Sequence, residues 1–462
     1  MAKERRPVSP PDRRRVKIAF VGGGSQSWGP RLIRDIIFKK ELAEAELEIA
    51  LLDAHAGRGR AMKRLFDVQI DRWKTDRIRV YATQDAKRAL RGADFVLIAI
   101  STGGLEAMRH DLEIPERYGI YHTVGDTAGP GGWARALRNI PVFQEYATQI
   151  KELAPGAYVL NYTNPMGALT KVLADELGYS RVIGLCHGLF ESHEALRVIF
   201  GAKEEREVKL NFGGMNHFFW IVDFTVNGKD GYGLLSRKLG SRTLAELFDR
   251  MSTDQQGWSS RGRLASELLQ QYGVLPYIAD RHTCEFFGCY ITNRQTMERF
   301  GLVRTSIEER AASYSRAAAW IADITAGRGE LGTTPSRETA ADIMAAVTFD
   351  RGFTDVVNMP NIGQIPNLPA GAVVETMGYV DAGGARPLTV GPLPEQIRVL
   401  CAPHAEVQLR TVRAALSGDL EGALMALVAD PVCACLTASD AKKMGRELLE
   451  ANKHHLPQFF GG

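Results

Sequence analysis

The stretch that decides the predicted fold is residues 15–25, Arg-Val-Lys-Ile-Ala-Phe-Val-Gly-Gly-Gly-Ser. A short apolar run up to Val21 predicts a strand, and a helical pattern of apolar residues follows at 30–38. A glycine-rich turn between a strand and a helix is the context that indicates dinucleotide binding. Gly22 would permit the tight turn, while Gly24 and Ser25 would lie where a pyrophosphate approaches the helix N-terminus.

Asp53 supplies the acid that such a fold places at the end of its second strand. It follows the apolar run 47–52, about 30 residues beyond the glycines, whereas the usual spacing is about 20. A carboxylate here would accept hydrogen bonds from an adenosine ribose and repel a 2′-phosphate, which favours NAD over NADP. Ser27 stands where the usual third glycine would be, and a solvated loop acid or a helix cap is the alternative for Asp53.

Strands and helices then alternate up to about residue 200. Apolar runs at 95–100, 157–162 and 182–185 predict buried parallel strands, and Ser101 and Thr102 after the first run would pass close to a nicotinamide ribose. We therefore predict an α/β protein with a Rossmann-like, doubly wound parallel-sheet domain at 15–200 that binds NAD. A disordered basic arm at 1–14 would precede it, and a mixed α+β domain for substrate binding and oligomerisation would follow at 201–462.

Composition limits the other classes of function. The 462 residues are 24% charged with a net charge of +3, which argues against a dedicated nucleic-acid binder. No apolar run approaches the roughly 20 residues needed to span a bilayer, and the first fifteen residues lack the apolar core of a signal peptide. The six cysteines are sparse and without a repeating spacing, so free thiols and a cytoplasmic location are expected.

A candidate metal site combines two segments about thirty residues apart. Residues 182–187, Val-Ile-Gly-Leu-Cys-His, read as a short strand that delivers Cys186 and His187 to the carboxyl edge of the sheet. The second segment holds His217 between apolar residues, where two extended runs flank Gly213 and Gly214 as in a hairpin. A thiolate and an imidazole suit a divalent transition metal with open positions. The alternative is a buried cysteine and a core histidine.

Two further polar positions are expected near the same edge. Asn164 follows the strand at 157–162, where ligands of doubly wound sheets bind. Asp126 lies in the glycine-rich stretch 125–132, which reads as a mobile loop over a site, with a plain surface loop as the alternative. We therefore predict that both residues contact a substrate.

Five segments, taken together and in this order, resemble glycoside hydrolase family four, the NAD- and divalent-metal-dependent glycosidases. The resemblance covers nearly the whole chain, and it implies a small-molecule glycoside substrate, NAD and Mn²⁺ or another divalent metal as cofactors, and a homodimer or homotetramer. The segments are Phe20-Val-Gly-Gly-Gly-Ser25, Asn161-Tyr-Thr-Asn-Pro-Met166, Gly184-Leu-Cys-His-Gly188, Gly214-Met-Asn-His-Phe218 and Val357-Asn-Met-Pro-Asn-Ile-Gly-Gln-Ile-Pro-Asn-Leu-Pro369.

The resemblance also implies roles for particular residues. Cys186 and His217 match the family's metal ligands, Asn164 matches a position that contacts the sugar near the metal, and Asn161 is expected to contact the cofactor. The sequence Cys-His-Gly resembles the subgroup that acts on α-linked uronic acids, the α-galacturonidases and α-glucuronidases. His187 is the candidate acid that protonates the leaving group, and support of the metal site is its alternative.

The implied chemistry is hydrolysis without net redox change, an exception to hydrolysis by two carboxylates. NAD oxidises the sugar at C3, the C2 proton becomes acidic, and the leaving group is eliminated before the steps reverse. Other members place a catalytic tyrosine in a segment that resembles 273–285, and here Asp280 and His282 stand near its position. We predict that these two residues act as the base, with Tyr277 or a purely structural turn as alternatives.

An anionic sugar would require a cation in the substrate pocket. Arg281 and Arg294 are predicted for this role, with Arg138 and Arg109 as further candidates, because guanidinium binds a carboxylate or sulfonate through two hydrogen bonds. Three other functions stay open at this point. They are an NAD-dependent glycosidase for α-glucosides, α-galactosides or sulfoquinovosides, a 2-hydroxy-acid dehydrogenase, and a protein that senses NAD without turnover.

Overall fold

The computed structural model describes residues 14–250 and 262–461, so the predicted arm lies outside the described residues except for Arg14. Six parallel strands form the half of the sheet nearer the N-terminus, in the order β3-β2-β1-β4-β5-β6. This is the strand order of a doubly wound dinucleotide-binding fold, as predicted. The strands are β1 (Arg14–Val21), β2 (Ala45–Leu52), β3 (Ile78–Thr83), β4 (Phe95–Ile98), β5 (Tyr158–Asn161) and β6 (Val182–Gly184).

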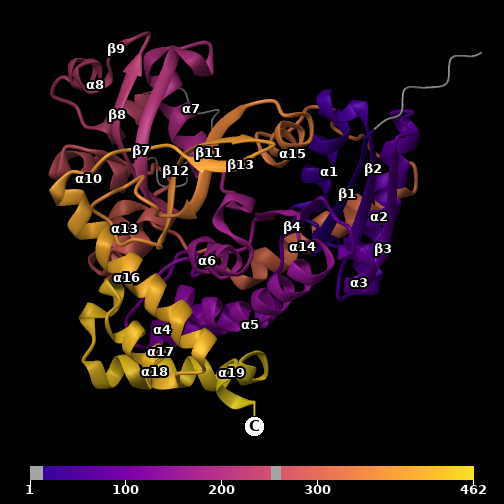
Figure 1. The fold of residues 1–462 in the computed structure, drawn as a ribbon. Helices are drawn as coiled ribbons and strands as arrows, with labels where there is room; N and C mark the ends of the chain where they lie inside the picture. The colour runs from indigo at the N-terminus through magenta and orange to yellow at the C-terminus, as the bar shows by residue number, and fades with distance from the viewer. Residues whose placement is uncertain (1–13, 251–261, 462) are drawn as a thin grey trace, which may run out of the picture.

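Helices cover both faces of this half (Figure 1) because successive side chains of each strand point to opposite faces. In β1, Ile18 and Phe20 belong to the apolar core shared with α1 (Gly29–Phe38), α2 (Ala56–Arg72) and α15 (Ala340–Phe349). Ala19 and Val21 belong to the core on the other face, shared with α5 (Gly129–Leu153) and α6 (Met166–Leu177). The strand is therefore apolar on both faces, which is what a buried parallel sheet requires.

The sheet continues without a break into the second half of the chain. Asn358 pairs with Gly184 and Glu375 pairs with Gly214, so the antiparallel strands join directly onto β6. The boundary predicted near residue 200 therefore falls within one continuous sheet, and the division into two domains and the oligomerisation role stay predictions. The added strands, from β6 outward, are β11 (Phe353–Pro360), β12 (Val373–Asp381), β7 (Val208–Met215), β8 (Phe218–Val226) and β10 (Leu275–Pro276), with β13 (Gly384–Pro387) beside β12 and β9 (Lys229–Asp230) beside β8.

The β7–β8 hairpin turns at a different place from the one the glycines indicate. Met215 pairs with Phe218, so Asn216 and His217 form the turn, and His217 has a φ of +62°. Gly213 and Gly214 instead lie inside β7, where a Cβ on Gly214 would be 2.4 Å from the carbonyl oxygen of Phe218. The glycines serve close backbone packing, and the polar pair makes the turn.

The remaining helices pack around these strands and beyond them, and those from α16 onward gather at one end of the molecule (Figure 1). None of the helices in the described residues is long and apolar enough to cross a membrane.

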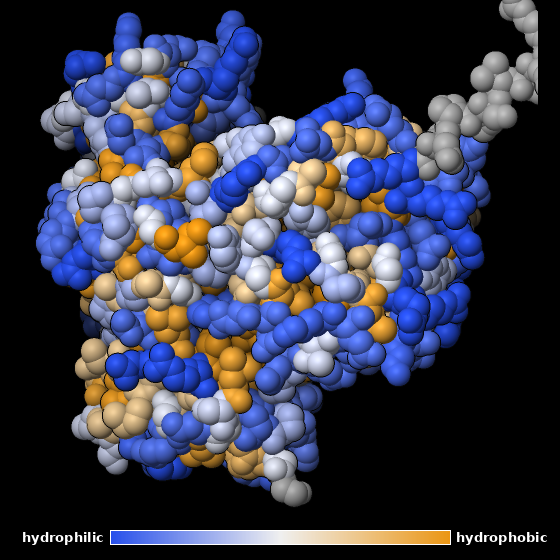
Figure 2. Space-filling view, viewed as in Figure 1, coloured by the Kyte–Doolittle hydropathy of each residue, from blue (hydrophilic) through white to orange (hydrophobic). Residues whose placement is uncertain are grey.

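Figure 2 shows a face on which polar residues predominate, with apolar residues between them. All six cysteines lie in described segments and are free thiols, as predicted. The α-helices not named above are α3 (Ala86–Leu90), α4 (Gly104–Arg117), α7 (Gly188–Phe200), α8 (Gly231–Leu239), α9 (Leu244–Arg250), α10 (Arg263–Tyr272), α11 (Asp280–Thr283), α12 (Gly288–Ile291), α13 (Arg294–Phe300), α14 (Ile307–Thr325), α16 (Glu395–Ser417), α17 (Leu420–Val428), α18 (Ala438–Ala451) and α19 (Pro457–Phe460).

Candidate active site

Cys186 and His217 meet at the carboxyl edge of the sheet. Cys186 comes two residues after the end of β6, His217 lies in the β7–β8 turn, and their Sγ and Nε2 atoms are 3.2 Å apart. Both side chains are buried. Burial raises the pKa of the Cys186 thiol to about 12, and the carboxylate of Glu375 adds to this effect. A metal ion that binds here would therefore have to displace the thiol proton.

Asp126 and His282 complete a cluster of donors around this pair. Ligand atoms of Asp126, His217 and His282 all lie within 4.8 Å of one another. The rings of His217 and His282 are 4.2 Å apart between centroids. Among the described residues, Nδ1 of His282 is a buried atom without a hydrogen-bond partner. These three side chains, and the Cys186 sulfur beside His217, are donor types that a divalent transition metal accepts.

The electrostatics of the cluster favour a neutral imidazole beside a charged carboxylate. Burial lowers the pKa of His282 well below its ordinary value, and the neighbouring His217 adds to this effect. The His282 ring is therefore free to accept a proton or to bind a metal. Burial opposes ionisation of Asp126, but its pKa still falls below the ordinary value because the charged Arg135 guanidinium lies near it and the Thr127 hydroxyl donates to it.

Asn164 lies next to Asp126, and the contact of both residues with a substrate stays a prediction. Its Nδ2 donates to Oδ2 of Asp126 over 3.3 Å, and its carbonyl oxygen accepts from Nε of Arg135 at 2.9 Å. Its Oδ1 is buried without a partner among the described residues, which leaves an acceptor available for a ligand.

The glycine-rich loop is shorter than its sequence indicates. Residues from Gly129 onward form the start of α5, so the prediction of a loop through 132 is wrong. A Cβ on Gly131 would be 2.9 Å from the carbonyl oxygen of Asp111, and one on Gly132 would be 2.4 Å from the carbonyl carbon of Thr127. These glycines allow the helix to begin against neighbouring backbone, and the loop that carries Asp126 is fixed at that end.

His187 lies between the metal pair and the glycine turn of the nucleotide site. Its ring is 6.3 Å from the ring of Trp28, and its side chain is 46% exposed. Nδ1 of His187 lies 3.5 Å from Oε1 of Glu338, a buried residue just before α15. The Glu338 carboxylate raises the pKa of His187 to about 9, so the imidazole carries a proton at neutral pH. This is the state that an acid catalyst needs.

The predicted nucleotide residues are brought together at the other strand ends. Gly22 has a φ of +85°, and a Cβ there would be 2.2 Å from the carbonyl oxygen of Ala99. The amide of Gly24 donates to Asp53 Oδ2 at 2.9 Å, and Oδ1 accepts from the amide of His55. The carboxylate thus orients the glycine turn, and its contact with a ribose stays a prediction. Ser25 faces the start of α1, where its Oγ accepts from the amide of Trp28 at 3.3 Å.

Two predicted site residues are engaged in structural contacts. Both carboxylate oxygens of Asp280 accept hydrogen bonds from backbone amides at the start of α10, those of Leu264 and Ala265, at 2.9 Å, which argues against its predicted role as the base. Asn161 is fully buried, and its side chain bonds to Thr163 and Thr170. It shapes the turn that leads to Asn164, which argues against direct contact with a cofactor.

Ser101, Thr102 and Arg294 were also predicted to contact a cofactor or substrate, and each has a different environment. Ser101 is exposed, and the hydroxyl of Thr102 donates to Asn139 Oδ1 at 2.8 Å. Arg294 is largely exposed and pairs with Glu116, so the structure does not bring it to the cluster.

Arg281 directly precedes His282, and its guanidinium donates to the Thr305 hydroxyl. The further candidates Arg138 and Arg109 are already paired, Arg138 with Asp111 and Arg109 with Glu113 and Glu308. The alternative base, Tyr277, is buried and its hydroxyl donates to Glu191 at 3.2 Å.

Sequence reasoning did not select Arg135, Glu338 or Glu375 for the site. Arg135 follows the Asp126 loop by only two turns of α5, a spacing that could have identified it. Glu375 is buried and accepts from Asn216 Nδ2 at 2.7 Å, next to His217. Glu338 and Glu375 reach the site from distant segments, and no local pattern marks them.

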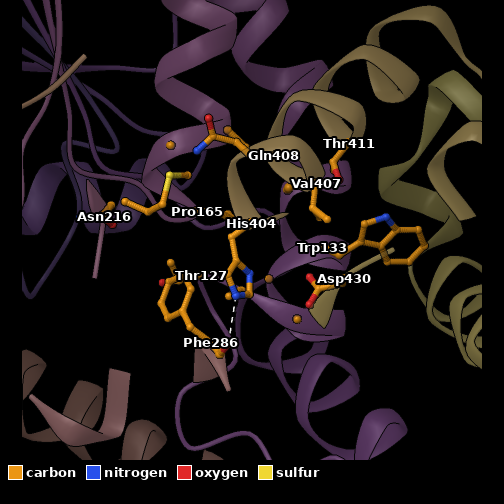
Figure 3. Close-up of a pocket in the computed structure, with 17 residues that line it drawn as sticks. Thr127, Trp133, Pro165, Asn216, Phe286, His404, Val407, Gln408, Thr411 and Asp430 are labelled. Carbon is orange, nitrogen blue, oxygen red and sulfur yellow. Dashed lines mark hydrogen bonds between the residues drawn. The ribbon is translucent and has the colours of Figure 1, made fainter. Parts of the chain in front are cut away.

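A cavity of about 70 Å³ adjoins the cluster (Figure 3). Thr127 and Asn216, the chain neighbours of Asp126 and His217, line it together with His404, Gln408 and Asp430. A water molecule occupies about 10–15 Å³ on this measure, so the cavity has room for a few waters and is too small for a sugar.

Fold and site together define an enzyme class in which a dinucleotide-binding sheet carries transition-metal donors at its cofactor edge. The chain belongs to glycosyl hydrolase family 4, since the family 4 profile matches residues 17–201 and the profile of the family's C-terminal domain matches residues 212–433.

Relatives and solved structures agree with this assignment. An α-galacturonidase of Thermoanaerobacter italicus is 30% identical, covering 96% of this chain and 97% of the relative. An α-galactosidase of Rhizobium meliloti is 32% identical, covering 96% and 89%. The Bacillus subtilis protein lplD, described as a glucosidase, superposes with a TM-score of 0.85 at 30% identity, covering 94% of this chain and all of that one. A 6-phospho-β-glucosidase of Thermotoga maritima, solved with manganese, NAD+ and glucose 6-phosphate, gives a TM-score of 0.77 at 23% identity, covering 95% and 99%.

Proposed function

We propose that this protein is a NAD- and Mn²⁺-dependent glycosidase that hydrolyses α-linked sugars carrying a carboxylate, of the galacturonide or glucuronide type. The observation that carries the proposal is the cluster of Cys186, His217, Asp126 and His282 at the carboxyl edge of a dinucleotide-binding sheet. A plain 2-hydroxy-acid dehydrogenase would need the sheet and no such cluster.

The residues present fit both cofactors. Gly22, Gly24 and Asp53 form the turn that receives a dinucleotide, and the Thermotoga maritima relative binds NAD+ in the same fold. Cys186 and His217 would hold the metal, with Asp126 and His282 in reach of it. When bound, NAD supplies a hydride acceptor for a sugar carbon, and Mn²⁺ supplies a Lewis acid beside the oxidised oxygen.

The protein's own groups have distinct tasks in this proposal. His187, protonated through its contact with Glu338, would donate a proton to the departing glycosidic oxygen. His282, neutral because it is buried, would accept the proton that leaves C2. Asn164 would position a sugar hydroxyl through its free Oδ1, and Asp126 would hold the Asn164 amide in place.

Arginines near the cluster favour an anionic sugar over a neutral one. Arg135 lies close enough to Asp126 to lower the pKa of that carboxyl, and Arg310 lies near Arg135. Nε atoms of Arg281 and Arg310 are buried without a partner among the described residues. A guanidinium group that has an N–H donor without a partner can bind a carboxylate. The α-galactosidase of similar identity keeps a neutral α-galactoside as the second candidate substrate.

A panel of 4-nitrophenyl glycosides tests the substrate class. The panel contains the α-galacturonide, α-glucuronide, α-galactoside, α-glucoside and sulfoquinovoside, assayed with Mn²⁺, NAD and a reductant. The proposal expects the uronides to react fastest and Arg310→Gln to reduce that preference, since the variant removes a charge without altering the metal ligands. Preference for the neutral α-galactoside would contradict the proposed substrate. NADH accumulation on 2-hydroxy acids, without glycoside cleavage, would contradict the proposed reaction.

A further inference from the structure

Glu285 forms a buried connection between the two segments that carry Asp126 and His282. It lies in the 3-10 turn Cys284–Phe286, directly after α11, and its side chain is inaccessible to solvent. Its Oε1 accepts from the amides of Val124 and Gly125 at 2.7 and 2.8 Å and lies 3.1 Å from Nδ1 of His122. All three donors come from the run of residues that immediately precedes Asp126.

Two further hydrogen bonds hold the residues that Glu285 connects. The amide of Gly131, at the start of α5, donates to Nε2 of His122 over 3.2 Å. Nδ1 of His122 therefore carries the ring proton and donates to Glu285. The hydroxyl of Thr123 donates to the carbonyl oxygen of Arg281, the residue before His282.

We propose that Glu285 is a positioning residue that sets the distance between Asp126 and His282 and so prepares the donor cluster for its metal. The inference rests on the proposed function, because it assigns the cluster to Mn²⁺. Asp126 is the next residue after Gly125, whose amide donates to Glu285. His282 lies three residues before Glu285 in the chain. Both donors are thus tied to one carboxylate, although about 155 residues separate them in the chain.

Geometry explains why a carboxylate stands at this position. A carboxylate only accepts hydrogen bonds, and the loop offers three N–H donors within reach of a single oxygen. Glutamine would keep the shape and one acceptor oxygen but would lose the charge that strengthens these bonds. The loop of Asp126 would then be held less firmly. Groups that orient metal ligands typically change metal affinity by about 10–100-fold when they are replaced.

The test measures Mn²⁺ binding and loop protection separately in Glu285→Gln. Titration of Mn²⁺ into the protein with NAD and reductant, followed by electron paramagnetic resonance, gives the metal affinity. Hydrogen exchange of peptides that cover 122–126 reports the loop. The proposal expects faster exchange in those peptides and Mn²⁺ affinity lower by about 10–100-fold. Thr123→Val removes the hydroxyl, which contacts the Arg281 carbonyl and lies 3.3 Å from Glu285 Oε1, but it leaves the three N–H donors to Glu285 in place. It should shift both quantities in the same direction by less, and it replaces Glu285→Gln if that variant does not fold.

Asp35→Asn is the matched control. Asp35 is also buried and also accepts an amide from a distant segment, that of Ser336 at 2.7 Å, but it belongs to α1 and is not part of the donor cluster. It should keep the wild-type Mn²⁺ affinity even where stability falls. Faster loop exchange in Glu285→Gln with unchanged Mn²⁺ affinity would overturn the inference and leave Glu285 a structural residue. Absence of Mn²⁺ binding in the wild type would instead overturn the proposed function, and this is seen before any variant is measured.

Discussion

The ion pair between Arg138 and Asp111 gives a stability prediction that can be worked from the structure. Both side chains are fully buried, and the guanidinium bonds both carboxylate oxygens, at 2.8 and 2.5 Å. Nε of Arg138 also donates to the carbonyl oxygen of Thr102 at 2.9 Å. The pair therefore joins α4 to α5 beneath the loop predicted to lie near the nicotinamide ribose.

Asp111→Leu leaves the guanidinium buried with only the Thr102 carbonyl as a partner. Two charge-assisted hydrogen bonds of about 1.5–3 kcal/mol each are lost, in line with the 3–5 kcal/mol typical of breaking a buried pair. We expect Asp111→Leu to lower the free energy of unfolding by about 3–5 kcal/mol. The double variant Asp111→Leu/Arg138→Met replaces both charges by apolar groups of similar size, so it should recover most of this loss.

Equilibrium unfolding in urea, with reversibility checked by dilution, measures Asp111→Leu, Arg138→Met and the double variant. The account predicts strong coupling, in which the double variant is more stable than Asp111→Leu alone. Additive losses in the double variant, or a loss below about 1 kcal/mol in Asp111→Leu, would refute the reasoning from burial.

Four further predictions concern the site. Glu338→Gln removes the carboxylate that raises the pKa of His187 to about 9, so the alkaline limb of the kcat/KM profile should move to lower pH; an unmoved limb would remove His187 as the acid. The same contact stabilises the fold below the ordinary histidine pKa and loses this contribution as the pH rises through about 9, which thermal melts across pH 6–10 would show. Gly22→Ala adds about 1–2 kcal/mol of left-handed backbone strain and a clash with Ala99, so a fluorescence titration should show weakened NAD binding, and wild-type affinity would contradict the turn geometry. Mn²⁺ at a hundredfold excess over its Kd should stabilise the folded protein by about 2.7 kcal/mol and so raise its melting temperature. Cys186→Ser should abolish this rise, and a retained rise would place the metal elsewhere.

The sequence alone was enough to place those site residues that directly follow a strand of the parallel sheet. Because the carboxyl ends of parallel strands meet at one edge, Cys186 after β6 and Asn164 after β5 could be placed near each other without coordinates. Gly22 and Asp53 were predictable in the same way, since the first turn and the end of the second strand are neighbours in this fold.

Contacts between segments far apart in the chain were not predictable, because the residue pattern within one helix or strand carries no information about them. Asp126 and His282 come together only through the packing of the loop after α4 against α11, and Glu338 reaches His187 from a loop some 150 residues away. Asp280 was misassigned for a related reason. A carboxylate near a catalytic segment looks the same in sequence whether it faces a ligand or caps a neighbouring helix, and here it caps α10.

The most direct test of the central claim is hydrolysis of the best 4-nitrophenyl uronide in D₂O, with Mn²⁺, NAD and reductant present. Proton NMR of the released sugar reports deuterium at C2, and absorbance at 340 nm reports NADH. The account predicts cleavage that requires both NAD and Mn²⁺, deuterium at C2 of the product, and no net NADH. Cleavage that proceeds without NAD, or a product that keeps its C2 hydrogen, would contradict it.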